Sequence, residues 1–157
     1  WGGFYQNGKS SIVATSGLRY LLQGKCWNPL PAPRNGEGKE LTLTGATAML
    51  AVSPDGEAQI ICAGGVNHDI FWDAISGTYS KVAQADYLKK DISWYQFNGC
   101  PLTYKLKTER WEILSHPTPL LARAGAQVAM RKHTLYYIGG ELKPGLRSPG
   151  IVQLDLR

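Results

Sequence analysis

The sequence predicts an all-β fold built from the blades of a kelch-type β-propeller. Paired glycines recur along the chain, at residues 2–3, 64–65 and 139–140. The segments around these glycine pairs follow one order along the chain. A Gly-Ala segment comes first, and an apolar run that ends on the glycines follows it. After a third segment comes one that opens with Trp27 or Trp111 and is closed by prolines. A four-strand unit that recurs in this way is typical of a propeller blade, and kelch blades repeat at about 50 residues.

Each strand of the unit has a physical reason for its place. The Gly-Ala segments at 45–48 and 125–128 are expected to be innermost, because blades crowd around the axis and leave room only for small side chains. The apolar runs at 59–63 and 135–138 are expected to be buried between neighbouring blades. The tryptophan segments predict the outermost strands, where an indole covers the flank of a blade.

The repeat divides the chain into a little over two blades. Residues 1–33 predict the outer strands of one blade, residues 44–119 a complete blade, and residues 121–157 the first three strands of a further blade. Natural propellers close with about four to eight blades, and open sheet edges invite aggregation. We therefore expect the ring to be completed either by further blades of a longer polypeptide or by other copies in a homo-oligomer.

The complete blade carries an insertion at about 71–100. The stretch from Gly65 to Trp111 is much longer than the equivalent stretch from Gly3 to Trp27. A short helix is expected at 83–90. Long excursions from a compact repeat are often functional, and an insertion that only packs its own aromatic side chains is an equally good interpretation. It should leave the ring on the same side as the residues that follow the third glycine pair.

The stretch after that third pair carries acidic and basic groups on a short loop. Glycine enters positive φ without steric cost, so the pair predicts a tight exit from the preceding apolar strand. Glu141, Lys143 and Arg147 then surround a Pro144-Gly145 turn. Charged groups on a loop held by a stiff strand suit a small anionic substrate, although most charged loops are solvated surface.

Composition excludes several classes of function. The net charge is +5, but the Lys and Arg residues are scattered, so nucleic-acid binding is not supported. No apolar stretch approaches the length needed to span a bilayer. The cysteines, at positions 26, 62 and 100, show no metal-ligand spacing, and Cys62 is expected to be an inert core thiol. The sequence predicts no metal site and no cofactor.

At this point the residues resemble a known family, the N-acetylneuraminate epimerases, and within it the cyclically permuted branch. The resemblance rests on residues 1–4, 64–71, 95–98, 124–126 and 139–147. Its most specific mark is the string Gly-Glu-Leu-Lys-Pro-Gly-Leu-Arg at the end of the last stretch. The family's members are sialic acid mutarotases on a six-bladed kelch propeller, of which roughly half is absent here. The resemblance also implies a periplasmic or exported protein.

The resemblance implies interconversion of the α and β anomers of N-acetylneuraminate, a small anionic sugar. The family's proton acceptor is the glutamate of this string, which is Glu141 here. A guanidinium binds a carboxylate bidentately, so Arg147 is expected to hold the substrate carboxylate, with Lys143 as a point-charge helper. Arg123, on the expected axis-lining strand, is a second candidate if it points into the channel. Asn67 is expected to reach the same rim and to hydrogen-bond sugar hydroxyls.

Three classes of function stay open at this level. The first is the sugar-acid epimerase. The second is a kelch-type protein-interaction module without catalysis, which exposed aromatic side chains in the insertion would favour. The third is a glycosidase, which needs two carboxylates flanking one bond, with Asp69 or Asp73 as the partner of Glu141. His68, close to Asn67, is more often a structural than a functional residue type in such a place.

Overall fold

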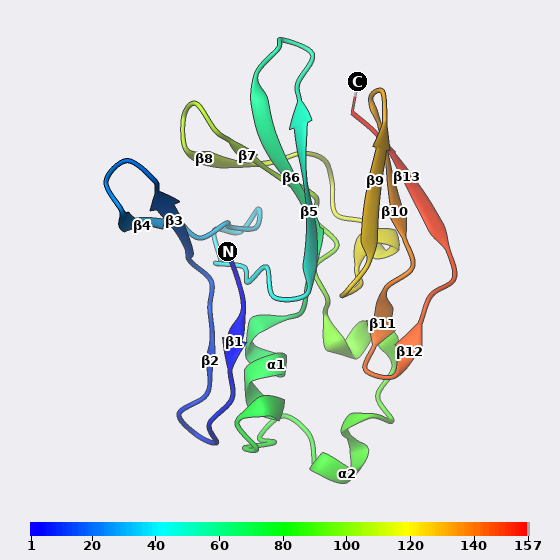
Figure 1. The fold of residues 1–157 in the computed structure, drawn as a ribbon. Coiled ribbons are helices and arrows are strands. Elements are labelled where there is room, and N and C mark those ends of the chain that lie inside the picture. Colours follow the sequence, from blue (N-terminus) through cyan, green and yellow to red (C-terminus); the bar gives the residue numbers. More distant parts are fainter. Residues whose placement is uncertain (157) are drawn as a thin grey trace.

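The computed structural model describes residues 1–156, which form mainly short antiparallel strands (Figure 1). The strands are β1 (Phe4–Tyr5), β2 (Ile12–Val13), β3 (Gly17–Leu21), β4 (Cys26–Leu30), β5 (Ala46–Val52), β6 (Ala58–Gly64), β7 (Leu102–Lys105), β8 (Arg110–Ile113), β9 (Gln127–Arg131), β10 (Thr134–Ile138), β11 (Glu141–Lys143), β12 (Leu146–Arg147) and β13 (Ile151–Asp155). The helices are α1 (His68–Ile75) and α2 (Gln84–Tyr87), with 3-10 turns η1 (Ile92–Tyr95) and η2 (Pro119–Leu121).

The central blade is a four-stranded antiparallel sheet, in the order β5-β6-β7-β8. Its first strand contains the small residues of the Gly-Ala segment and contacts β9, the corresponding strand of the next blade. Its last strand carries Trp111, whose indole N–H donates to the Pro31 carbonyl at 3.1 Å. The Trp1 indole donates to the same oxygen at 2.8 Å and packs edge-on against Trp111, so the tryptophans join two blades.

Partial blades flank the central one on either side. Strands β3 and β4 form a hairpin before it, and the sheet after it has the order β9-β10-β13. Within that sheet β10 pairs along its whole length with both neighbours, from Thr134 to Ile138. This arrangement confirms the predicted fold class, an all-β propeller of which part of the ring is present. Strands β5 and β9, which follow the two Gly-Ala turns, lie at the edges of their sheets and contact each other.

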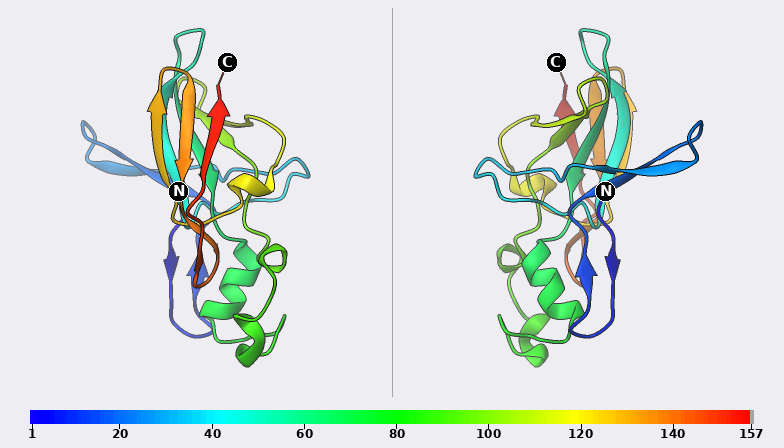
Figure 2. Two further views of the ribbon diagram at one scale, coloured as in Figure 1. Left: turned by 90° about the vertical axis from the view of Figure 1, so that its right-hand side faces the viewer. Right: turned by 90° about the vertical axis from the view of Figure 1, so that its left-hand side faces the viewer.

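The three glycine pairs mark equivalent places in the three blades. Every glycine of these pairs has a positive φ, from +65° at Gly139 to +103° at Gly65, a region that side chains with a Cβ avoid. An excursion follows each pair: the β1–β2 hairpin, the helical insertion, and the β11–β12 hairpin. These excursions project from the same end of the blades, as Figures 1 and 2 show.

The insertion between β6 and β7 contains a helix that the sequence interpretation missed. We expected a helix at 83–90, and the structure has the shorter α2 there, at Gln84–Tyr87. The longer helix is α1, which begins where the Asn67 side chain accepts hydrogen bonds from the backbone N–H groups of Asp69 and Ile70. An asparagine in this position caps a helix, and the aromatic residues that follow it obscured this local signal.

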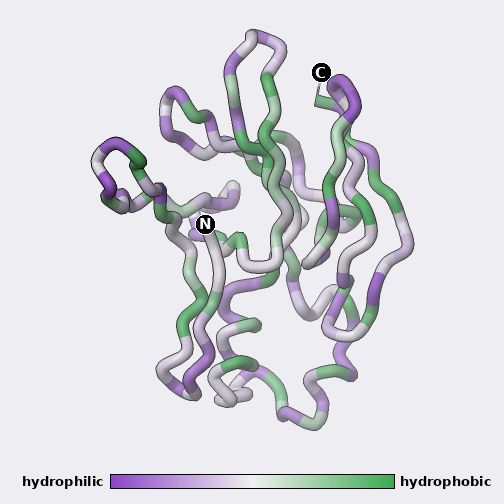
Figure 3. The backbone as a smooth tube through the Cα atoms, in the orientation of Figure 1, coloured by the Kyte–Doolittle hydropathy of each residue, from purple (hydrophilic) through white to green (hydrophobic). Residues whose placement is uncertain are grey.

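The main core lies between the central blade and the next one. Ala51 and Ile61 of the central blade pack with Leu135 and Tyr137 of β10, and Leu121 closes the cluster from the linker. Hydrophobic stretches lie on these strands and on several other segments, while the turn between β9 and β10 is hydrophilic (Figure 3). None of the helices formed by residues 1–156 is long and apolar enough to cross a membrane.

Candidate active site

The charged loop after the third glycine pair is a two-stranded hairpin, β11–β12. Glu141 and Arg147 are cross-strand partners, and so are Lys143 and Leu146. Pro144 and Gly145 form the turn between them, with Gly145 at a φ of +80°, as expected of a Pro-Gly turn. The register shifts between Glu141 and Lys143, so a bulge separates these two charged residues.

Glu141 and Arg147 form a loose ion pair at the base of this hairpin. The Arg147 Nε atom lies 3.7 Å from Glu141 Oε1, with side chains that are 83% and 36% exposed, respectively. Exposed ion pairs of this kind contribute only about 0–1 kcal/mol. The guanidinium can therefore leave Glu141 for another carboxylate at little cost.

The backbone of Glu141, in contrast, is held firmly. Its N–H donates to the Ala124 carbonyl at 2.7 Å, and its own carbonyl accepts from the Ala124 N–H at 2.9 Å. The Gly139 N–H donates to the Gly150 carbonyl at 3.0 Å, which joins the segment before β11 to the segment after β12. An exposed guanidinium thus lies beside a carboxylate whose backbone is held by hydrogen bonds.

Lys143 connects the hairpin to the insertion. Its ammonium donates to the carbonyls of Lys90 at 2.7 Å and Leu88 at 3.2 Å, both in the segment after α2. The expected juxtaposition of the insertion with the β11–β12 hairpin is therefore present. Two of the three ammonium donors are engaged, which leaves one for a substrate.

Replacement of Lys143 by methionine should loosen the insertion, because two charge-assisted hydrogen bonds are lost while the aliphatic stem is kept. We expect backbone amides at 88–92 to exchange with solvent roughly tenfold faster, as measured by hydrogen–deuterium exchange mass spectrometry. Lys89→Met is the matched control, since the Lys89 ammonium pairs with Asp86 on the exposed surface. Equal exchange in both variants would contradict the proposed connection.

Arg123 differs from its expected placement. It lies in the linker between η2 and β9 rather than on the axis-lining strand, and only 4% of it is exposed. Its Nη1 atom donates to the Gly139 carbonyl at 2.8 Å, and its guanidinium lies 5.6 Å from the centre of the Tyr137 ring. The next residue, Ala124, pairs with Glu141, and the Arg123 side chain contacts the segments that flank the hairpin.

Asn67 follows the end of β6, as expected, but its side-chain oxygen is engaged in capping α1. Its amide nitrogen is 3.4 Å from Gln96 Oε1. His68, the next residue, contacts Asp69 Oδ1 and the Val13 carbonyl through its two ring nitrogens, at 2.8 and 3.2 Å. Both side chains thus hold the insertion in place, and the part of Asn67 that remains for a ligand is its amide N–H group.

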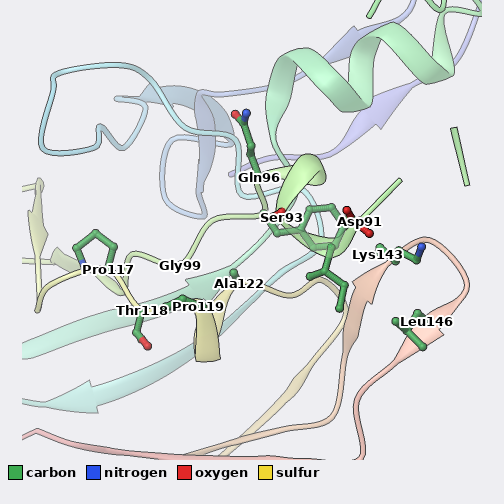
Figure 4. Close-up of a pocket in the computed structure, with 12 residues that line it drawn as sticks. Asp91, Ser93, Gln96, Gly99, Pro117, Thr118, Pro119, Ala122, Lys143 and Leu146 are labelled. Atoms are coloured by element: carbon green, nitrogen blue, oxygen red, sulfur yellow. The ribbon is translucent and has the colours of Figure 1, made fainter. Parts of the chain in front are cut away.

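A cleft of about 920 Å³ is lined by the insertion, the hairpin and the linker that precedes β9. Figure 4 shows Lys143 and Leu146 on one side of it, η1 in the middle, and the linker at 117–122 on the other side. Its lining is largely apolar and does not include Glu141 or Arg147. The cleft therefore lies beside the ion pair and not around it.

The other carboxylates considered for a two-carboxylate site are engaged elsewhere. Hydrogen bonds from Lys39 and then from His68 lower the pKa of Asp69 to about 2. Asp73 is 3% exposed and accepts hydrogen bonds from Ser80 and from the Lys81 N–H. Since both carboxylates stabilise the insertion, the contacts of the described residues give no support to a glycosidase.

The aromatic side chains of the insertion are mainly packed against one another. Tyr87 makes edge-on contacts with Tyr79, Trp94 and Tyr95. Tyr95 is fully buried, and its hydroxyl donates to the Tyr87 carbonyl. A protein-interaction surface needs such rings exposed, so this packing weakens the interpretation as a binding module.

Comparisons with known proteins identify the family and support the fold. The sequence profile of the N-acetylneuraminate epimerase family matches residues 1–157. N-acetylneuraminate epimerase 1 of Escherichia coli O6:H1 (strain CFT073) is 32% identical over 100 residues, which is 56% of this chain and 26% of that protein. The N-acetylneuraminate epimerase of Escherichia coli (strain K12) is 31% identical over 100 residues, covering 59% of this chain and 27% of that protein.

A solved structure of YjhT is similar over 99% of this chain, with a TM-score of 0.77 and 25% sequence identity. The matched region is 45% of the YjhT chain. The chain therefore spans less than half of this solved structure, and its aligned part about a quarter of the curated relatives.

Proposed function

The chain belongs to the N-acetylneuraminate epimerase family, and from this premise we propose that the protein interconverts the anomers of N-acetylneuraminate. The relatives named above carry this activity in their names. The observation that supports it most directly is the pairing of Glu141 with Arg147 on one braced hairpin. A carboxylate and a guanidinium in contact match a substrate that has a carboxylate next to its reacting carbon.

The chemistry that we assign to Glu141 is proton transfer. A glutamate is ordinarily ionised at neutral pH and can accept the proton of the anomeric hydroxyl. The bond between the anomeric carbon and the ring oxygen then breaks, and the ring oxygen gains a proton, directly from the carboxyl group or through water. Rotation of the open-chain keto form and closure on the opposite face reverse both transfers and give the other anomer.

The role that we assign to Arg147 is to hold the substrate carboxylate bidentately. Its ion pair with Glu141 supports this role, because the pair is long and exposed and can be broken at little cost. Substrate binding would draw the guanidinium away from Glu141 and leave that carboxylate free to take the proton. Lys143 adds positive charge on the same hairpin, and Asn67 can offer its amide N–H group to a sugar hydroxyl.

The activity is tested by proton NMR of freshly dissolved N-acetylneuraminate, which follows the approach to anomeric equilibrium with and without the whole protein. We expect the protein to accelerate the approach without moving the final ratio of anomers. No acceleration by the whole protein would reject the epimerase and favour the interaction module. Buffer is included as a reference, because the sugar also interconverts slowly by itself.

Replacement of Arg147 by alanine should weaken substrate binding more than it slows the chemistry. A hydrogen bond to a charged group contributes about 1.5–3 kcal/mol, so we expect KM to rise roughly 10- to 100-fold in saturation measurements by NMR. The KM of Arg147→Lys should lie between those of the wild type and Arg147→Ala, since lysine keeps the charge but loses the planar guanidinium. Arg34→Ala, which removes an exposed guanidinium paired with Glu40, serves as the control, and an unchanged KM in Arg147→Ala would refute the assignment.

A further inference from the structure

The most unusual charged residue of the chain lies beneath the candidate site. Arg123 is 4% exposed, and none of the ion pairs among residues 1–156 includes it. Its Nε atom is buried and has no hydrogen-bond partner. A guanidinium keeps its charge at any physiological pH, and burying it without a carboxylate is costly unless other groups compensate. The other contacts of the Arg123 side chain must therefore offset the cost of burying its charge.

Those contacts converge on the neck of the β11–β12 hairpin. The Nη1 atom of Arg123 donates to the Gly139 carbonyl at 2.8 Å, on the leg before β11. The same atom lies 3.3 Å from Ser148 Oγ and 3.4 Å from the Gly150 carbonyl, on the leg after β12. One nitrogen thus bridges both legs, at the place where the hairpin leaves the blade.

Arg123 is itself fixed from the blade side. Its carbonyl accepts hydrogen bonds from the Gly65 N–H at 3.0 Å and from the Tyr137 hydroxyl at 3.3 Å. Its guanidinium lies over the Tyr137 ring, a favourable position for a cation. The next residue, Ala124, exchanges both backbone hydrogen bonds with Glu141. Two consecutive residues therefore hold the neck and the backbone of Glu141.

We propose that Arg123 is a positioning residue, which acts through the hairpin neck to hold the Glu141–Arg147 pair in its reactive geometry. This inference rests on the proposed function and assigns Arg123 no contact with substrate. Precise placement matters because displacing a reacting group by about 1 Å can cost about 10²-fold in rate. A loosened neck would let both charged side chains move together.

The test compares Arg123→Met with Thr103→Val. Arg123→Met keeps the stem of the side chain and removes every side-chain contact with the neck. Thr103→Val removes a buried hydroxyl of β7 that donates to Gln59 Oε1 at 2.9 Å, and it leaves Arg123 and the neck untouched. Both variants should be less stable, but only Arg123→Met should disturb the site. Ser148→Ala provides a milder change at the neck, should Arg123→Met fold poorly.

Two readouts decide the outcome. In hydrogen–deuterium exchange, Arg123→Met should make amides at 139–150 exchange at least roughly tenfold faster, with strands β5 and β6 unchanged. In the NMR assay of the whole protein, kcat should fall about 10²-fold while KM changes less than about threefold. Arg123→Lys, which keeps one nitrogen donor, should recover part of kcat, and Ser148→Ala should shift both readouts in the same direction.

Unchanged exchange at 139–150 in Arg123→Met and Ser148→Ala would overturn the inference. A rise in KM with normal kcat would also overturn it, because Arg123 would then be contacting substrate. An equal fall of kcat in Thr103→Val would show that the effect comes from lost stability alone, and it would reject a specific role for Arg123. A wild-type protein without epimerase activity would reject the proposed function, and the exchange measurement would still decide whether Arg123 braces the hairpin.

Discussion

Replacement of Glu141 by glutamine is expected to reduce the acceleration of anomer interconversion about 10²- to 10⁴-fold. General acid–base catalysis by one positioned group is typically worth this much, and an amide cannot accept the proton of the anomeric hydroxyl. Glutamine has the same shape as glutamate and keeps an oxygen facing Arg147, and the backbone bonds of this residue to Ala124 do not depend on its side chain. The loss should therefore appear in kcat, with a much smaller change in KM.

The measurement is the NMR approach to anomeric equilibrium, at several substrate concentrations. Glu112→Gln is the control, because Glu112 is an exposed glutamate on β8, the outermost strand of the central blade. It should leave both kinetic constants unchanged. Full activity in Glu141→Gln would show that another group accepts the proton, and the proposed mechanism would fail.

Much of the fold could be predicted because its signals are local and repeated. The glycine pairs mark strand ends that require positive φ, and the chain adopts it at all of them. The order of strands in the central blade follows the order of the segments along the chain. Helix α1 was missed because its one local signal, the capping residue Asn67, is weaker than the repeated glycine pattern. Most of the stability of such a helix comes from tertiary packing, which local sequence does not show.

Part of the candidate site could be predicted from local sequence, and part of it could not. Glu141 and Arg147 are brought together by a hairpin of a few residues around a Pro-Gly turn, so sequence alone could place them side by side. Arg123 contacts Gly139 and Gly150, residues that are distant from it in sequence. An arginine next to a Gly-Ala strand gives no indication of such partners. Its burial follows from how two blades meet, which is a property of the whole fold.

The contact between blades leads to a prediction about Gly64, which ends β6. Its φ is +77°, and a Cβ added there would fall inside the contact distance of the Tyr137 hydroxyl and of the Arg123 carbonyl oxygen. A carbonyl oxygen cannot move without moving its backbone, and Tyr137 is fully buried. Gly64→Ala should therefore destabilise the protein by about 2–5 kcal/mol, because the cost of overpacking adds to that of a left-handed backbone.

Gly56→Ala separates the steric clash from the strain of the backbone. Gly56 has a φ of +86° and nothing within 4 Å of an added Cβ, so its replacement should cost only the about 1–2 kcal/mol of a left-handed conformation. Urea unfolding of both variants measures the difference, and equal losses would contradict the predicted clash. Because Arg123 is one of the residues displaced, Gly64→Ala should also speed amide exchange at 139–150, whereas Gly56→Ala should not. Packing between two blades would then control the placement of Glu141.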